Sequence, residues 1–269
     1  MLREALPYLK KFSGKIFIIK AGGQVLGHPD FEQLIKDVAT LVHLNIKVVF
    51  VFGAGPQFDE KLTEEKISFE KIKGLRITTK KMLPILKEVT DEDAQKIKKL
   101  FQKENVEMVR VENFLKSKKI DFQNLKEEHF TGTVDEVDVG AIKKCFEKKQ
   151  LPVSFSLVEN KNCNADDIVF ALAKNLKAEK VIFLTGTRGV FVEDTNGKIE
   201  MLSSATPEIL AKYIAKGDIH GGMIPKVQSA INILQSGISN VHIISGLLDG
   251  TLLTEIFTDK GVGTMIKLK

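Results

Sequence analysis

Short continuous runs of hydrophobic residues alternate along the chain with segments in which hydrophobic residues recur every three or four positions. Residues 16–19 and 48–52 form two such runs, and the segment 30–45 between them has the helical spacing. Continuous apolar runs are typical of strands buried on both faces of a parallel sheet. The alternation predicts βαβ units and therefore an α/β fold, with a mainly parallel central sheet between two layers of helices.

The same alternation continues toward the end of the chain. We expect a strand over 151–158, a helix over 164–178 and a strand that begins at 180. The charged stretch before them predicts two helices, one over 80–88 and a second that begins at Asp91. Because no proline-rich linker or low-complexity tract interrupts the pattern, any two lobes are expected to share one sheet or to pack tightly.

Local signals add a hairpin and an N-terminal helix. Asn196-Gly197 lies between two short strand-like runs and predicts a tight β-hairpin. Residues 3–12 predict an amphipathic helix. Its expected apolar face consists of Leu6, Leu9 and Phe12.

Composition excludes several classes of function. The 269 residues include 40 Lys and Arg and 35 Asp and Glu, and the two signs are interspersed, as on solvated helix faces rather than on a nucleic-acid surface. Cys145 and Cys163 are far apart, and the five histidines lack ligand spacing, so neither a disulfide framework nor a zinc site is expected. No apolar run approaches the roughly 20 residues that span a bilayer, so we expect no membrane span and a cytoplasmic location.

Four glycine-rich turns predict an anion-binding site, because glycine lets backbone N–H groups approach a ligand. They are Gly22-Gly23, Gly53-Ala54-Gly55, Gly186 with Gly189, and Gly221-Gly222, all placed at strand ends. Carboxyl ends of parallel strands gather at one edge of the sheet, where ligands bind. The pattern is neither a dinucleotide fingerprint, since Phe58 stands where a third glycine is needed, nor a Walker loop.

Charged residues near these turns suggest phosphoryl transfer. Lys20 ends a buried strand, where an ammonium group needs a carboxylate or a phosphate partner. Lys226 follows Pro225, a residue that suits a first helical position, so the lysine lies in a first turn whose dipole disfavours a cation. Asp166 follows Asn164 at the start of a predicted helix. Its carboxylate is expected either to interact favourably with the helix dipole or to serve as the counter-ion of the lysines. Together they could neutralise and position a phosphoryl group.

Eight ordered sequence blocks resemble the acetylglutamate kinases of the amino acid kinase family. The blocks are IIKAGG, GAGPQ, KGLRIT, TGTVDEV, NCNADD, FLTGTRGV, GGMIPKV and FTDKGVGTMI. The resemblance implies an open αβα sandwich, MgATP as the phosphoryl donor, and transfer of the γ-phosphoryl group to the γ-carboxylate of N-acetyl-L-glutamate in arginine biosynthesis. It also implies an N-terminal helix over 1–14, a substrate lobe over 15–176 that also mediates dimerisation and an ATP lobe over 177–269.

The resemblance assigns roles to individual residues. The catalytic residues would be Lys20, Lys226 and Asp166. The substrate-binding residues would be Gly53, Ala54, Gly55, Arg76 and Asn162. The phosphate- and nucleotide-binding residues would be Gly22, Gly23, Thr185, Gly186, Gly189 and Gly222. The protein itself would supply no metal site, because Mg²⁺ would arrive with ATP.

Two loops depart from the usual family pattern. Phe52-Gly53-Ala54-Gly55-Pro56 stands where the family usually has His-Gly-Gly-Gly-Pro, and Leu184-Thr185-Gly186 where it usually has Leu-Thr-Asp. Both loops resemble the kinase portion of bifunctional acetylglutamate synthase–kinases, so we expect a free-standing kinase of that branch or the kinase part of a longer protein. The departures keep two alternatives open, a kinase for another acylated amino acid such as N-acetylaminoadipate, and a catalytically silent regulatory domain that binds arginine.

The N-terminal helix resembles the extension of arginine-inhibited acetylglutamate kinases, where such helices link dimers into a hexameric ring. The resemblance therefore implies a homodimer or a higher homo-oligomer, and arginine as a feedback inhibitor. No nucleic-acid or membrane partner is expected.

Overall fold

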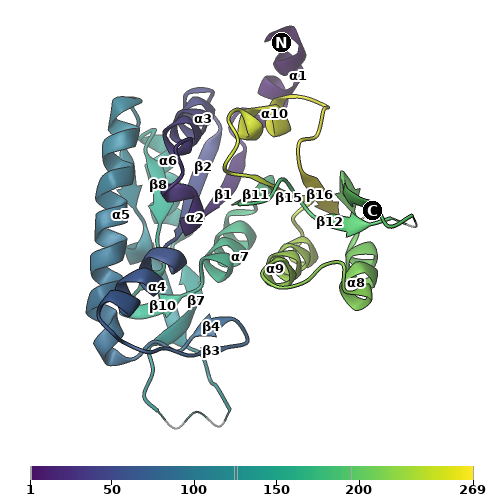
Figure 1. The fold of residues 1–269 in the computed structure, drawn as a ribbon. Coiled ribbons are helices and arrows are strands. Elements are labelled where there is room, and N and C mark those ends of the chain that lie inside the picture. Colours follow the sequence, from purple (N-terminus) through teal and green to yellow (C-terminus); the bar gives the residue numbers. More distant parts are fainter. Residues whose placement is uncertain (1, 124, 126, 195, 269) are drawn as a thin grey trace.

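The computed structural model describes residues 2–123, 125, 127–194 and 196–268, and its centre is one eight-stranded sheet (Figure 1). In spatial order the strands are β14 (Ser204–Ala205), β16 (Thr264–Lys267), β15 (Asn240–Ser245), β11 (Lys180–Thr185), β1 (Ile16–Gly22), β2 (Lys47–Gly53), β8 (Leu151–Ser154) and β5 (Met108–Arg110). Every neighbouring pair is parallel except β15 with β16. The predicted α/β class with a mainly parallel sheet is confirmed, and the sheet runs through both predicted lobes.

Helices cover both faces of this sheet. One face packs against α1 (Leu2–Phe12), α2 (Gly23–Leu26), α3 (Phe31–His43), α5 (Leu83–Lys103) and α10 (Thr251–Phe257). The other packs against α6 (Val139–Glu147), α7 (Ala165–Leu176), α8 (Pro207–Lys216) and α9 (Met223–Gln235). Successive residues of β1 point to opposite faces, so Phe17 and Ile19 join the first core and Ile18 the second. This two-sided burial explains the continuous apolar runs.

Smaller elements surround the sheet. A second sheet has the order β6 (Leu115–Lys119), β7 (Thr131–Val137), β10 (Lys161–Cys163) and β9 (Leu157–Val158). Two hairpins pair β3 (Lys71–Ile72) with β4 (Leu75–Arg76), and β12 (Phe191–Glu193) with β13 (Ile199–Met201). The segments η1 (Lys80–Met82) and η2 (Glu112–Phe114) are short 3₁₀ helices. The helix α4 (Gly55–Glu64) follows β2. The hairpin predicted from Asn196-Gly197 is confirmed, with Gly197 in the left-handed region at φ 80°.

Three features differ from the prediction. The two helices expected over 80–88 and from Asp91 are one helix, α5, because nothing after Pro84 breaks it and Lys87 pairs with Asp91 across one turn at 2.5 Å. The single strand expected over 151–158 is divided into β8 and β9, which belong to different sheets. On α1, Phe12 is buried and Leu9 packs against the core as predicted, but Leu6 is exposed, because the helix turns Ala5 and Tyr8 toward the core in its place.

A further difference concerns α9 and its glycines. Gly221-Gly222 does not follow a strand, as we expected, but joins α8 to α9. The helix α9 begins at Met223, so Pro225 is its third residue rather than its first. Proline has no backbone N–H, and the N–H groups at the first positions of a helix have no intrahelical acceptor, so no hydrogen bond is lost at Pro225 and the residue is tolerated there.

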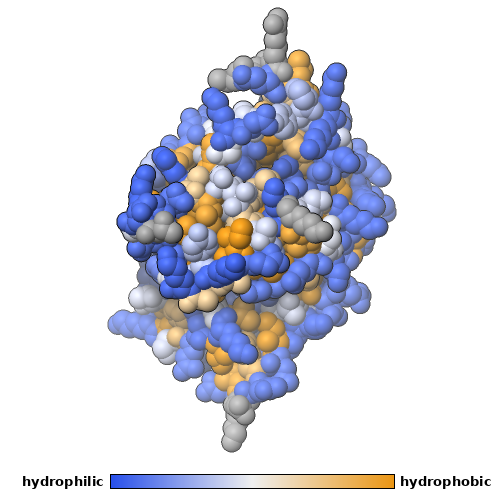
Figure 2. Space-filling model, turned by 90° about the vertical axis from the view of Figure 1, so that its right-hand side faces the viewer, coloured by the Kyte–Doolittle hydropathy of each residue, from blue (hydrophilic) through white to orange (hydrophobic). Residues whose placement is uncertain are grey.

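The face formed by the C-terminal third is mixed in character. Figure 2 shows polar side chains over most of this face, with hydrophobic side chains in separate patches between them. The exposed large hydrophobic residues of this part of the chain include Phe191, Ile199 and Ile209. Within the described residues, no helix has the length and apolar character needed to cross a membrane.

Candidate active site

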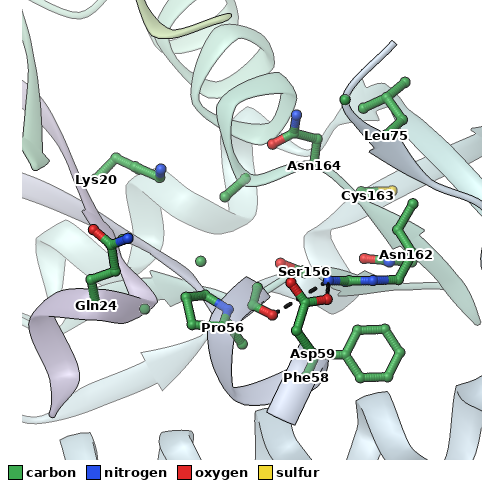
Figure 3. A pocket seen from close by; sticks show the side chains of 18 of the residues that line it. Lys20, Gln24, Pro56, Phe58, Asp59, Leu75, Ser156, Asn162, Cys163 and Asn164 are labelled. Carbon is green, nitrogen blue, oxygen red and sulfur yellow. Dashed lines mark hydrogen bonds and ion pairs between the residues drawn. The ribbon is translucent and has the colours of Figure 1, made fainter. Parts of the chain in front are cut away.

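A cleft opens where the carboxyl ends of β1, β2 and β11 meet. The parallel register places Gly22 beside Gly53 and Ala21 beside Leu184, so the turns after the three strands lie at the same edge. The cleft has a volume of about 360 Å³. Eleven predicted site residues line it, namely Lys20, Gly22, Gly23, Gly53, Ala54, Gly55, Arg76, Asn162, Thr185, Gly186 and Lys226. Figure 3 shows Lys20 and Gln24 on one side and Asp59 and Asn162 on the other.

Lys20 and Asp166 form an ion pair at one end of the cleft. The Lys20 Nζ to Asp166 Oδ1 distance is 3.0 Å, and the two side chains are 12% and 14% exposed. Asp166 is held in the first turn of α7, where Asn164 caps the helix by accepting a hydrogen bond from the Asp166 N–H at 3.1 Å. The contact therefore joins the end of a buried strand to the start of a helix, and it supplies the counter-ion that a buried ammonium requires.

Lys226 faces the same end of the cleft from α9. Its Nζ donates to the carbonyl oxygen of Gly222 at 3.0 Å, one turn back along the helix. Burial lowers the pKa of Lys226, the positive charge of Lys20 lowers it further, and Asp166 opposes the shift. Lys20 and Lys226 line the same cleft, and Lys20 pairs with Asp166, so the two ammonium groups and the carboxylate are treated as one cluster. We call it the phosphoryl end, defined by Lys20, Lys226 and Asp166.

Arg76 forms the centre of the opposite end. Its guanidinium group lies 4.6 Å from the ring centroid of Phe58 and 4.9 Å from that of Phe69, and it pairs with Asp59 of α4. Asp59 also accepts from Lys71 Nζ at 3.1 Å. Burial lowers the pKa of Arg76 to about 10, so the group stays charged at neutral pH. We call this cluster the carboxylate end, defined by Arg76, Lys71 and Asp59.

One donor of Arg76 is left without a protein acceptor. The side chain is 8% exposed, and its buried Nε has no hydrogen-bond partner among the described residues. Leaving a buried charged donor unpaired costs free energy, so such a group is expected where a ligand supplies the acceptor. An anionic ligand fits this position, since a guanidinium group binds carboxylates through several N–H donors.

Asn162 and the glycine turns form the wall between the two ends. Asn162 lies on β10 and donates from Nδ2 to Thr78 Oγ1 at 2.8 Å, which fixes its side chain. Gly23 has no space for a side chain, because a Cβ there would lie 2.7 Å from the Gly53 carbonyl oxygen. At Gly22 and Gly55 a Cβ would meet nothing within 4 Å, so the protein packing does not itself require glycine there.

Three predicted site residues, Asp166, Gly189 and Gly222, are not among those that line the cleft. Thr185 and Gly186 lie at the end of β11, where the Thr185 hydroxyl donates to the Thr187 carbonyl oxygen at 2.9 Å. Gly222 contributes the carbonyl oxygen that Lys226 contacts. Gly189 lies outside the cleft lining and packs closely against Thr264, whose Oγ1 would be 2.6 Å from an added Cβ.

Several residues of the cleft escaped the sequence reasoning. Asp59 and Phe58 line the cleft from an ordinary amphipathic helix, and Lys71 lines it from a charged stretch without a motif. Phe69 of the same stretch does not line the cleft but packs on Arg76. Their only available signal was proximity to the GAGPQ turn, which precedes Phe58 directly. Gln24 lines the cleft beside the Gly22-Gly23 turn, and nothing in its type indicated a role.

A nucleoside triphosphate and its metal ion suit the phosphoryl end. Two ammonium groups, backbone N–H groups at glycine turns and the start of α9 are donors that bind phosphate oxygens. Among the described residues, no three His, Cys, Asp or Glu side chains gather as a metal-binding group. A Mg²⁺ ion bound there would be held mainly by the phosphates, with Asp166 as the nearest carboxylate of the cluster.

The parallel sheet with paired lysines at its carboxyl edge defines an α/β protein of the small-molecule kinase class. The chain belongs to the amino acid kinase family, whose model matches residues 15–245. It is 34% identical to the protein named acetylglutamate kinase from Neisseria meningitidis serogroup C (strain FAM18), over 99% of this chain and 93% of that protein. It is also 34% identical to the protein of the same name from Aquifex aeolicus, over 100% of this chain and 97% of that protein.

Solved structures share the fold. The N-acetylglutamate synthase from Neisseria gonorrhoeae, complexed with coenzyme A and L-arginine, superposes with a TM-score of 0.87 at 22% identity. The match covers 100% of this chain, which spans 65% of the length of that synthase chain. The carbamate kinase from Giardia lamblia bound to AMP-PNP has a TM-score of 0.69 at 18% identity, over 95% of this chain and 99% of that one.

Proposed function

We propose that this protein is an acetylglutamate kinase, which transfers the γ-phosphoryl group of ATP to the γ-carboxylate of N-acetyl-L-glutamate and so serves L-arginine biosynthesis. The observation that carries the proposal is the charge of the two ends of the cleft. Each end has two cations and one carboxylate, an excess of one positive charge. N-acetylglutamate has two carboxylates and an uncharged amide nitrogen, so it matches both ends at once, and the family relatives of the same name support the assignment.

The phosphoryl end supplies the chemistry. A γ-carboxylate oxygen forms a bond to the γ-phosphorus of ATP, and the bond from that phosphorus to the β,γ-bridging oxygen breaks, which leaves ADP. The attacking carboxylate is already ionised at neutral pH, so no protein base is needed. Lys20 and Lys226 stabilise the charge on the phosphoryl oxygens, while Asp166 holds Lys20 in place. Mg²⁺, when bound with ATP, neutralises part of the triphosphate charge.

The carboxylate end orients the acceptor. Arg76 binds the α-carboxylate through its free Nε and adjacent donors, and Asn162 with the Gly53-Ala54-Gly55 turn contacts the rest of the substrate. Gly22, Gly23, Thr185, Gly186, Gly189 and Gly222 serve the nucleotide and its phosphates. In this scheme residues 15–176 form the acceptor lobe and residues 177–269 the ATP lobe. We place the reaction in the cytoplasm, where ATP and amino acid precursors are available.

A hydroxylamine trap tests the proposal. Wild-type protein with MgATP and N-acetylglutamate is expected to give a hydroxamate, because hydroxylamine captures an acyl phosphate. Lys20→Met should abolish the product, whereas Lys15→Met, which changes an exposed lysine 3.8 Å from Glu179, should retain it. If N-acetylaminoadipate alone reacts, the acceptor is wrong. If no acylated glutamate or aminoadipate reacts, the proposed kinase activity is refuted, and a measurement of arginine binding then tests the second alternative.

Oligomerisation through α1 is a further part of the proposal. The helix extends away from the sheet, and its Leu6 side chain is 46% exposed (Figure 1). A single exposed leucine does not by itself indicate an interface, so the expectation that Leu6 packs against a second copy of the chain comes from the hexamers implied by the family resemblance. Sedimentation of wild type should show a homodimer or a larger assembly. Leu6→Asp should reduce the size, and an unchanged size would exclude α1 as the contact.

We also propose arginine as a feedback inhibitor. A buried polar cluster lies beside α1, where Lys180 Nζ is 2.9 Å from His242 Nε2 and His242 Nδ1 is 2.6 Å from Glu255 Oε1. Lys180 also lies 5.3 Å from the ring centroid of Phe12 in α1. Both oxygens of Glu255 already have partners, His242 for Oε1 and the Val262 N–H at 2.8 Å for Oε2, so an arginine guanidinium that binds this carboxylate would have to displace one of these contacts. Millimolar arginine should lower the activity of wild type and inhibit Glu255→Gln less, and unchanged wild-type activity would refute the proposal.

A further inference from the structure

Two glycine turns touch each other at the floor of the cleft. One follows β1 and contains Gly22 and Gly23, and the other follows β2 and contains Gly53 and Gly55. Gly22 and Gly53 are direct neighbours in the parallel register. Under the proposed function the first turn faces the phosphates of ATP and the second faces the acceptor, so their relative position decides how donor and acceptor meet.

Gln57 of α4 connects the two turns. Its side-chain Nε2 donates to the Gly23 carbonyl oxygen at 2.7 Å, across 34 residues of sequence. The contact is tight, because a Cβ on Gly23 would lie 2.2 Å from Gln57 Oε1 and 2.8 Å from Pro56 Cδ. Gln57 is two residues after Gly55 on the same helix, so the hydrogen bond ties the start of α4 directly to the β1 turn.

The Gln57 hydrogen bond connects the two turns beyond the point where the pairing of β1 with β2 ends. The ladder between β1 and β2 ends at Gly22 and Gly53, and the chain beyond it leaves the sheet as α2 and α4. Beyond that point Gln57 provides a side-chain hydrogen bond from the second turn to the first. Gln57 itself is not among the residues that line the cleft.

We propose that Gln57 is a positioning residue, which fixes the phosphate-side turn against the acceptor-side turn and thereby aligns the two substrates for transfer. This inference rests on the proposed function. Loss of the hydrogen bond lets the turns shift relative to each other while each turn keeps its own contacts. A displacement near 1 Å at a reacting centre lowers the rate about 100-fold. The change is therefore expected in kcat rather than in the affinity for either substrate.

Gln57→Met tests the proposal, because methionine has a similar size and no N–H donor. We expect kcat to fall about 10- to 100-fold, with the dissociation constants of AMP-PNP and of N-acetylglutamate, each titrated alone, nearly unchanged. Gln102→Met, on the exposed side of α5, is the matched control and should behave as wild type. Hydrogen exchange of the peptide 21–27 should become faster in Gln57→Met only.

Gln57→Glu distinguishes hydrogen bonding from packing. An ionised glutamate cannot donate to the Gly23 carbonyl oxygen, whereas a protonated one can. The activity of this variant, divided by that of wild type, should therefore rise as the pH falls, while the same ratio for Gln57→Met stays flat. A Gln57→Met variant that has wild-type kcat and exchange would overturn the proposal, as would parallel losses of kcat and of both affinities. If wild type itself forms no hydroxamate, the proposed function fails, and the exchange of peptide 21–27 still decides whether Gln57 holds the turn.

Discussion

Removal of the Arg76 charge is the sharpest test of how the acceptor is recognised. The Arg76 side chain is 8% exposed, its guanidinium group packs on the rings of Phe58 and Phe69, and its Nε has no partner among the described residues. Under the proposed function it binds the α-carboxylate of N-acetylglutamate. Arg76→Met keeps an apolar side chain against the rings and removes every donor. The expected result is weaker use of N-acetylglutamate, with KM for ATP unchanged.

The magnitude follows from the contacts that would be lost. Hydrogen bonds to charged groups contribute about 1.5–3 kcal/mol, which corresponds to about 10- to 150-fold in kcat/KM. The α-carboxylate itself can be removed separately, because 4-acetamidobutyrate is N-acetylglutamate without that group. Wild type should prefer N-acetylglutamate over 4-acetamidobutyrate by about this factor. Arg76→Met should lose most of the preference, since the two substrates then differ by a group that has lost its main partner.

The assay is hydroxamate formation with N-acetylglutamate and with 4-acetamidobutyrate, each measured for wild type and for Arg76→Met. The four values of kcat/KM form a thermodynamic cycle. Arg76→Met also removes one of the two cationic partners of Asp59 and leaves only Lys71, so the carboxylate that remains could repel the substrate. The double variant Arg76→Met with Asp59→Asn removes that repulsion and controls for it. If Arg76→Met discriminates between the two acceptors as strongly as wild type, Arg76 does not bind the α-carboxylate.

Three further predictions concern catalysis and stability. Asp166→Asn should lower kcat about 100-fold or more, because Lys20 loses its counter-ion, and steady-state kinetics at saturating substrates would show it. Burial raises the pKa of Asp93 to about 6, so its ionised form destabilises the fold fully above that pH and not below its ordinary value of 3.8. In urea unfolding, Asp93→Asn should therefore stabilise by up to about 3 kcal/mol at pH 7.5 and by about half as much at pH 5, and a gain that does not depend on pH would contradict this. Gly23→Ala should lower the unfolding temperature by an amount equivalent to about 1–3 kcal/mol, because its Cβ meets backbone at 2.7 Å, whereas Gly22→Ala, with nothing within 4 Å, should not.

The central sheet could be predicted because its strands are buried on both faces. A residue such as Ile18 or Phe50 has no polar alternative in that position, so the sequence shows uninterrupted apolar runs. The ends of helices and strands were harder to predict where no residue type requires the element to stop. Nothing marks the end of β8 at Ser154 except the change of sheet that follows, and the continuity of α5 through Asp91 depends on packing along its whole length.

The phosphoryl end was predictable for an electrostatic reason. A lysine at the end of a buried strand cannot remain without an anion, so the sequence alone indicates that Lys20 requires a partner. The identity of that partner depends on the tertiary fold, which brings Asp166 from a distant helix to 3.0 Å from the ammonium group. Lys226 was recognised by a similar conflict, a cation in the first turns of a helix, although its helix begins earlier than predicted.

The carboxylate end and the Gln57 contact show the limit of this reasoning. Asp59 and Gln57 are polar residues on a helix that reads as amphipathic, and either could be solvated without cost, so their residue types demand no partner. Their roles depend on what faces them in space, a guanidinium group for Asp59 and the Gly23 carbonyl oxygen for Gln57. A side chain that would destabilise the fold without a partner, such as a buried lysine, can therefore be recognised from the sequence. A side chain that only orients other residues is recognised from its contacts in the structure. The Gln57 variants test this second kind of residue, because their predicted effect lies in alignment and not in charge or affinity.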